Sequence, residues 1–257
     1  MGRIILGDML KVLGSELVPP NSVDLIVTSP PYNVGKEYEK KLTFEEYRDF
    51  IAKAMERMYT VLKEGGRICI NVSNLWKRPY VAVNRLIWDV AENVGFYPMA
   101  EIIWDKGAKV VRHSIAWGSW LSAKAPIVRE QHEYILVMAK GTPKRPDAGE
   151  STISKDEFIE FTKSVWYINP VGSRAKKLGH PAPFPEKLPY RCIQLFSYKG
   201  DLVLDPFAGS GTTCLVAGRL GRRWICIDKE EKYVSAMTER LRKAGLEFEV
   251  VNASNLG

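Results

Sequence analysis

Short apolar runs alternate with stretches of helical periodicity from one end of the chain to the other. Strands are expected at RIIL (3–6), VDLIVT (23–28), RICINVS (67–73), YPMAEIIW (97–104), HEYILVMA (132–139), DLVLD (201–205) and RWICID (223–228). Helices are expected between them, notably at 186–197, 212–220 and 231–243. Alternation of this kind predicts a doubly wound α/β fold with a mostly parallel sheet.

Two further helices carry start signals in the sequence. Thr43 and Glu46 form a capping box ahead of a long amphipathic stretch, which the pair Gly65 and Gly66 should end. Ser154 and Glu157 repeat the same box ahead of a short helix. A helix is also expected from Pro79 to Asn93, with proline in its first turn.

The chain of 257 residues is 46% hydrophobic, enough for one sizeable core or for one core with an inserted lobe. Its composition changes at 141–179, which is rich in Pro, Gly, Ser and Lys and is expected to be an inserted recognition region rather than core. The parts on either side, 1–140 and 180–257, are then two halves of one domain. No apolar run approaches the ~20 residues of a membrane span, and the N-terminus does not resemble a signal peptide, so a cytoplasmic protein is expected.

Cysteine and histidine are sparse and scattered. Neither the four cysteines nor the three histidines show the short spacing of a metal site or of a disulfide framework. We therefore expect buried free thiols and no bound metal.

The net charge is +7, and the positive charge is concentrated. From Trp104 to Arg145 there are eight Lys or Arg and three acids, and from Lys163 to Pro185 four bases and no acid. The first window includes a long loop with Trp117 and Trp120. This loop is expected either to form the lip of a pocket that contacts phosphates or to be a solvated loop anchored by its tryptophans.

The segment LVLDPFAGSGTTCLVAGRLGRRWICID predicts a strand, a glycine-rich turn, a helix and a second strand. Asp228 follows Gly209 by 19 residues, at the end of the second strand, where a carboxylate can accept both hydroxyls of a ribose. Cys214 replaces the third glycine of a pyrophosphate fingerprint, and Asp205 before the turn disfavours phosphate. A nucleoside with a cationic tail fits better, which favours S-adenosylmethionine over NAD; the alternative is a turn whose glycines serve packing alone.

The stretch TSPPYN places two prolines directly after an apolar strand. An exocyclic amino group on a base is a poor nucleophile because its lone pair is delocalised into the ring. Ser29 Oγ and the Pro30 carbonyl could accept its two N–H bonds and restore nucleophilicity, while the prolines keep the turn rigid. Tyr32 offers a flat face on which an extruded base could stack.

The glycine loop and the proline turn together resemble the amino-methylating DNA methyltransferases, which modify N4 of cytosine or N6 of adenine with S-adenosylmethionine. The catalytic turn precedes the cofactor loop, as in the permuted β arrangement of that family. The resemblance implies a seven-stranded sheet with one antiparallel strand and helices on both faces. It also implies double-stranded DNA as substrate. Whether the chain acts with a cognate restriction endonuclease of the same system or is solitary, and whether it is a monomer or a homodimer, stays open.

The candidate residues follow from these motifs and from the resemblance. The catalytic candidates are Ser29, Pro30, Pro31 and Tyr32. The cofactor-binding candidates are Asp8, His180, Pro181, Phe184, Pro185, Asp205, Pro206, Phe207, Ala208, Gly209, Ser210, Gly211, Thr212 and Asp228. The DNA-binding candidates are Arg112, Lys124, Arg129, Arg174, Lys176 and Lys177.

Three questions stay open at this level. HPAPFP (180–185) differs from the usual HPTQKP of the adenine enzymes and favours cytosine N4 slightly over adenine N6. Methylation at cytosine C5 is disfavoured because none of the cysteines follows a proline. The alternative functions are an RNA or protein amide methyltransferase and an inactive DNA-binding partner.

Overall fold

The computed structural model describes residues 2–31, 42–75, 80–107, 118–128, 130–171 and 184–253. Within them the strands are β1 (Gly2–Leu6), β2 (Val23–Thr28), β3 (Leu62–Val72), β4 (Phe96–Asp105), β5 (His132–Lys140), β6 (Val165–Tyr167), β7 (Leu202–Asp205), β8 (Arg223–Asp228) and β9 (Phe248–Asn252). The helices are α1 (Met9–Val12), α2 (Phe44–Val61), α3 (Val83–Val94), α5 (Lys155–Phe161), α6 (Lys187–Phe196), α7 (Thr212–Arg219) and α8 (Glu231–Lys243).

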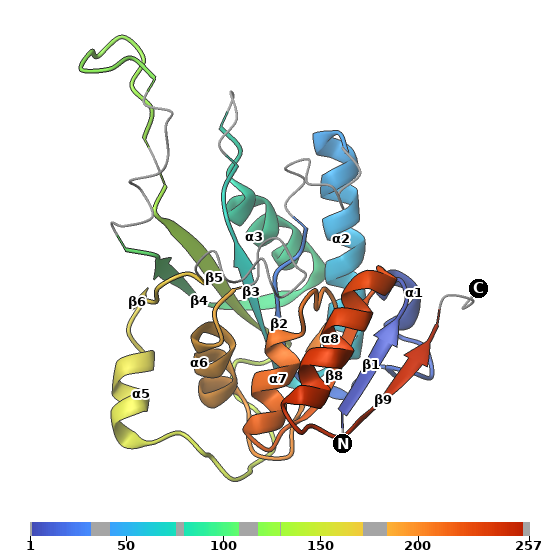
Figure 1. Cartoon of the computed structure of the whole chain (residues 1–257). Helices are drawn as coiled ribbons and strands as arrows, with labels where there is room; N and C mark the ends of the chain where they lie inside the picture. Colours follow the sequence, from blue (N-terminus) through green and yellow to red (C-terminus); the bar gives the residue numbers. More distant parts are fainter. Residues whose placement is uncertain are drawn as a thin grey trace.

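The strands form one sheet in the order β6-β4-β5-β3-β2-β7-β8-β1-β9 (Figure 1). β5 is antiparallel to both of its neighbours, and every other pairing among these strands is parallel. The single antiparallel strand is confirmed. The sheet has nine strands rather than the expected seven, because the short strands β6 and β9 extend its two edges.

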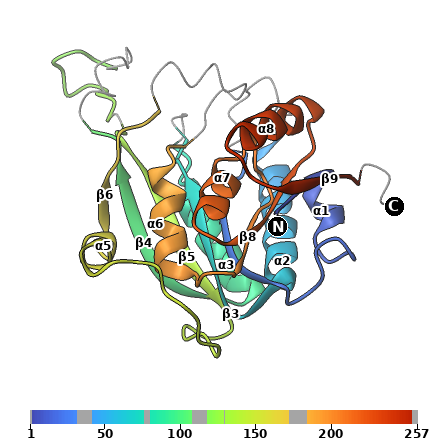
Figure 2. The ribbon, with the colours of Figure 1, turned by 60° about the horizontal axis from the view of Figure 1, so that its bottom comes forward.

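Helices cover both faces of the sheet (Figure 2). One hydrophobic cluster joins α1, α2 and α3 to the sheet, and a second joins α6, α7 and α8. The middle of central β2 is apolar because both of its faces are covered: Ile26 belongs to the first cluster, whereas Leu25 and Val27 belong to the second. A parallel strand that is buried on both faces has no face in solvent, so its residues do not alternate between apolar and polar.

The expected helix starts are confirmed at two places. Thr43 with Glu46, and Ser154 with Glu157, each form both hydrogen bonds of a capping box. The end of α2 differs from the prediction: the helix ends at Val61 rather than at the two glycines, because the next residue already pairs with β2. α3 starts at Val83, and Pro79 lies outside the described residues.

Part of the segment expected to be an insertion belongs to the core. β6 pairs with β4, and Trp166 on it is fully buried, with its Nε1 donating to the Phe161 carbonyl at 3.0 Å. Trp104 on β4 donates to the Ile168 carbonyl at 2.8 Å. The sequence of 141–179 did not predict β6, because a strand of three residues is too short to show an alternating pattern.

The expectation of four free thiols is wrong. Cys214 on α7 and Cys226 on β8 form a disulfide, with Cα atoms 6.2 Å apart. Helix and strand pack directly on each other, which brings two residues without a recognisable spacing within bonding reach. Cys69 and Cys192 are free and buried, as expected. Among the described residues, no helix combines the length and apolarity that crossing a membrane requires.

Candidate active site

The sequence motifs follow four neighbouring strands of the sheet, β2, β7, β8 and β1. They therefore lie together along the carboxyl ends of these strands, which we call the catalytic edge. The four strands run parallel, with Ile26 opposite Leu204 and Leu6 opposite Asp228. The proline turn therefore leaves the sheet beside the glycine loop, with Asp228 and Asp8 next in line. Such an edge, at the carboxyl ends of parallel strands, is where open α/β sheets bind ligands.

The proline turn begins where β2 ends. Ser29 and Pro31 are half-buried and Pro30 is buried, while Tyr32 lies outside the described residues. The preceding residue, Thr28, is 1% exposed, and its Oγ1 donates to Asp205 Oδ1 at 2.7 Å. This hydrogen bond ties the base of the proline turn to the base of the glycine loop.

Asp205 is the buried link between the two motifs. It is 1% exposed, and besides Thr28 it accepts from Thr213 Oγ1 at 2.7 Å and from the Phe207 N–H at 3.2 Å. Burial raises the pKa of Asp205 to about 6, against the hydrogen bonds from Thr28 and Thr213, which lower it. Both carboxylate oxygens thus serve the protein itself, and the side chain has almost no surface to offer a ligand.

The glycine loop is held in left-handed turns. Gly209 and Gly211 have φ of 50° and 73°, a region that L side chains rarely adopt. A Cβ on Gly211 would also lie 2.6 Å from Met237 Cγ of α8, so packing as well as φ requires glycine there. The loop is anchored by Ala208 N–H to the Ile227 carbonyl at 3.0 Å and by Gly209 N–H to Asp228 Oδ2 at 2.9 Å.

Two acidic residues stand beyond the glycine loop. Asp228 accepts one backbone N–H on each oxygen, from Gly209 and from Glu230, both at 2.9 Å. Burial raises the pKa of Asp228, partly offset by those two bonds. Asp8 is exposed and caps α1 by accepting from the Leu10 N–H at 2.9 Å. Each oxygen of Asp228 keeps a lone pair for a further donor, as two ribose hydroxyls would require.

Arg240 of α8 holds the glycine loop from behind, and no motif in the sequence singled it out. Its Nη1 donates to the Ser210 carbonyl at 3.0 Å and to Thr212 Oγ1 at 2.9 Å. Its Nη2 pairs with Glu186 at 3.1 Å, just before α6. Burial lowers the pKa of Arg240, partly offset by Glu186. The Ser210 and Thr212 side chains, both expected at the cofactor, are buried and bonded to this arginine.

The other candidates divide into placed and undescribed residues. Pro206 is buried, and Phe207 packs edge-on against Phe50 of α2 at 6.0 Å between ring centroids. Phe184 packs against the α6–α8 cluster and Pro185 is buried, immediately before Glu186. Lys124 is exposed on the excursion between β4 and β5. Outside the described residues lie His180, Pro181, Arg112, Arg129, Arg174, Lys176 and Lys177.

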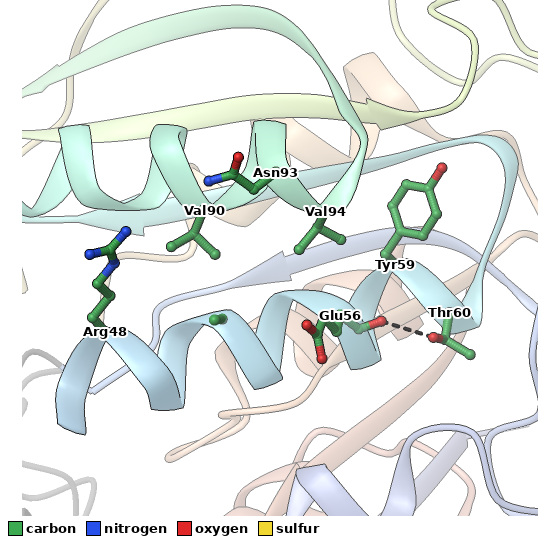
Figure 3. A pocket seen from close by; sticks show the side chains of 8 residues that line it. Arg48, Glu56, Tyr59, Thr60, Val90, Asn93 and Val94 are labelled. Carbon is green, nitrogen blue, oxygen red and sulfur yellow. Dashed lines mark hydrogen bonds between the residues drawn. The ribbon is translucent and has the colours of Figure 1, made fainter. Parts of the chain in front are cut away.

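Two hollows lie away from this edge. A groove of ≈ 440 Å³ runs between α2 and α3, lined by Arg48, Glu56 and Tyr59 of α2 and by Val90 and Asn93 of α3 (Figure 3). A smaller hollow of ≈ 340 Å³ lies at the opposite end of β2. It adjoins the three carboxylates Asp24, Asp147 and Asp201, which converge within 4.8 Å.

Cations already offset these carboxylates. Arg145 pairs with all three, at 2.5 Å to Asp201, 2.6 Å to Asp147 and 3.3 Å to Asp24, and Lys63 pairs with Asp24 at 2.6 Å. The cluster is an ion-pair network that fastens Arg145 and Asp147 to the amino ends of β2 and β7.

Comparison with known proteins is consistent with this geometry. The family model described as DNA methylase (N6_N4_Mtase) matches residues 23–239. Type II methyltransferase M.ScaI of Streptomyces caespitosus is 32% identical over 251 residues, which cover 91% of this chain and 79% of that protein. Type II methyltransferase M.MjaVI of Methanocaldococcus jannaschii is 40% identical over 153 residues, covering 58% of this chain and 78% of that protein.

A solved structure matches almost the whole fold. TTHA0409 of Thermus thermophilus, complexed with S-adenosyl-L-methionine, is 28% identical, with a TM-score of 0.80. The match covers 99% of this chain and 100% of that one.

Proposed function

The chain belongs to the N6/N4 DNA methylase family, and on that premise we propose that it transfers a methyl group from S-adenosyl-L-methionine to the exocyclic amino group of a base flipped out of duplex DNA. The observation that carries this proposal is the 2.7 Å hydrogen bond from Thr28 to Asp205. It fastens a turn suited to hold an amino group beside a loop suited to hold a nucleoside, as direct transfer between two bound molecules requires.

The residues at the β8 end fit the proposed cofactor. Asp228 would accept the ribose hydroxyls with its remaining lone pairs. Asp8 is exposed one strand further along, where it would approach the adenine of the cofactor. Gly209 lets the backbone approach the ligand closely. Bound here, S-adenosyl-L-methionine supplies an electrophilic methyl group on a sulfonium, so the chain needs no nucleophile of its own.

The residues at the β2 end would prepare the amino group. Ser29 Oγ and the Pro30 carbonyl each accept a hydrogen bond from one N–H of the amino group. These bonds keep the nitrogen lone pair out of the ring and direct it at the methyl group. Tyr32 stacks on the base and keeps it out of the duplex. The proton lost from nitrogen passes to water. We favour N4 of cytosine, on the HPAPFP sequence, with N6 of adenine as the alternative.

The basic windows are proposed to bind the DNA backbone through Arg112, Lys124, Arg129, Arg174, Lys176 and Lys177. The curated relatives are named type II methyltransferases, which supports a restriction-modification setting with a cognate endonuclease.

The test is transfer of labelled methyl to duplex DNA, followed by mass spectrometry of the nucleosides. We expect N4-methylcytosine or N6-methyladenine, and a loss of at least roughly a hundredfold in rate for Ser29→Ala. Ser151→Ala is the matched control and should keep full activity, because it removes an exposed hydroxyl outside the proline turn and the glycine loop. Label on RNA or protein but on no DNA, including unmodified genomic DNA, would contradict the proposal.

A further inference from the structure

The excursion between β4 and β5 ends in an exposed apolar tip, Trp120 and Leu121. Trp120 is 64% exposed and Leu121 88% exposed. Trp120 therefore does not anchor the loop in the core, which was one of the two expectations from the sequence. Large apolar side chains held in solvent by an ordered turn are typical of a surface that another molecule covers.

Backbone contacts, rather than burial of these side chains, define the turn. Gly118 bridges antiparallel to Pro126, and the Ser119 N–H donates to the Ala125 carbonyl at 2.9 Å. A Cβ on Gly118 would lie 2.2 Å from that carbonyl, so the two limbs close only around glycine. Leu121 has a φ of 51°, a left-handed conformation that is unusual for leucine. The turn thus accepts an unfavourable backbone at a residue whose side chain it presents outward.

The excursion that carries the tip leaves the sheet at the proposed catalytic edge. β4 runs in the same direction as β2, so the excursion leaves the sheet at the edge that carries the proline turn (Figure 1). Two strands lie between them, which places the roots of the excursion and the turn roughly 14 Å apart. That is well under one helical turn of DNA, roughly 34 Å. A duplex centred on the turn would therefore extend past the root of the excursion.

We propose that Trp120 and Leu121 form a wedge that enters the duplex and fills the gap left by the flipped base. The inference rests on the proposed function. Duplex DNA is the occupant that fits, because the apolar tip sits in a basic stretch and carries Lys124 beside it, exposed. Phosphates would bind the bases of the stretch while the apolar side chains replace lost stacking, as wedge residues do in proteins that kink DNA.

The test compares variants on two duplexes, after the wild-type recognition sequence has been mapped by sequencing methylated DNA. One duplex pairs the target base normally, and the other places it opposite an abasic site, where less stacking and pairing oppose extrusion. Leu121→Gly removes the side chain and suits the left-handed backbone, so it should fold as well as the wild type. Trp120→Ala is the second variant, and Phe158→Ala, a 54% exposed aromatic on α5, is the control.

We expect each tip variant to lose at least tenfold in kcat/KM on the paired duplex and no more than threefold on the abasic one. Fluorescence of 2-aminopurine at the target position should rise less with the variants than with the wild type. Equal losses on both duplexes, or no loss, with wild-type protein active, would overturn the wedge alone. A change of oligomeric state with unchanged kinetics would assign the tip to a protein contact and also overturn it. A wild type that methylates no DNA would overturn the proposed function and the wedge together.

Discussion

Replacing Thr28 with valine isolates one of the side-chain hydrogen bonds that join the two motifs. Valine keeps the branched shape of threonine, so the change removes the hydroxyl that donates to Asp205 at 2.7 Å and little else. The residue is 1% exposed, and water does not replace the lost donor easily. A hydrogen bond to a charged acceptor contributes about 1.5–3 kcal/mol, whereas a neutral one contributes about 1 kcal/mol.

The effect should depend on pH with a defined sign. The pKa of Asp205 is raised from 3.8 to about 6, so the folded protein holds this proton more tightly than the unfolded chain. At 1.36 kcal/mol per pKa unit, this carboxyl lowers the free energy of unfolding by about 3 kcal/mol as pH rises from about 4 to above 6. Thr28→Val removes a bond that lowers this pKa, so the pKa rises further. The variant should therefore be destabilised by about 2 kcal/mol at pH 8 and by about 1 kcal/mol or less at pH 5.

The assay is urea unfolding of both proteins at pH 5 and pH 8. Thr60→Val, at an exposed hydroxyl that donates to the Glu56 carbonyl of α2, is the matched control and should show a small effect that is independent of pH. In an Asp205→Asn background, the pH dependence of Thr28→Val should vanish. Because Ser29 follows directly, kcat should fall several-fold as the proline turn loosens.

One result would refute this reasoning. If Thr28→Val changed the free energy of unfolding by less than about 0.5 kcal/mol at pH 8, or equally at both pH values, the bond would not support an ionised Asp205. The two motifs would then be held together by the sheet and by the hydrogen bond from Thr213 Oγ1 to the Val27 carbonyl.

Two more predictions concern the support of the glycine loop. Arg240→Ala should raise KM for S-adenosyl-L-methionine by roughly tenfold in steady-state methylation assays, with a smaller change in kcat. Losing about 1.4 kcal/mol of loop stabilisation corresponds to that factor. Lys243→Ala, at an exposed cation on the same helix, is the control and should leave KM and kcat unchanged. Removing the Cys214–Cys226 bond by double substitution with alanine should lower the free energy of unfolding by about 3 kcal/mol, as expected for closing a loop of this length. Reductant should lower Tm of the wild type and not of the double variant, and equal Tm values for the oxidised wild type and the variant would contradict this.

The parts of the fold that could be predicted are those marked by local signals. The capping boxes at Thr43 and Ser154 need only residues three positions apart, and the glycine loop needs a strand before it and a helix after it. Edge strand β6 was missed because it has three residues, too few to show a pattern. β9 was missed because it has exposed residues on both faces, so its pattern does not differ from that of a loop.

The site was predicted as motifs but not as a connected structure. Thr28 is the last residue of a strand, and its partner Asp205 lies 177 positions away. Arg240 sits with two other bases in the last turn of α8, where cations ordinarily complement the helix dipole. Only the packing of α8 behind the loop turns that arginine toward Ser210. Side chains that link distant segments leave no local pattern, because their chemistry depends on the neighbours the fold brings.

The position of β1 has a consequence for how the molecule forms. The first strand of the chain pairs only with β8 and β9, the last two strands of the described residues. During synthesis its backbone donors and acceptors must therefore stay without these partners until β8 and β9 have left the ribosome. Asp8 and Asp228 reach the same edge when β1 pairs with β8. A chain interrupted before β8 would lack Asp228 and the strand that β1 pairs with, so the nucleoside end of the site is assembled after the proline turn.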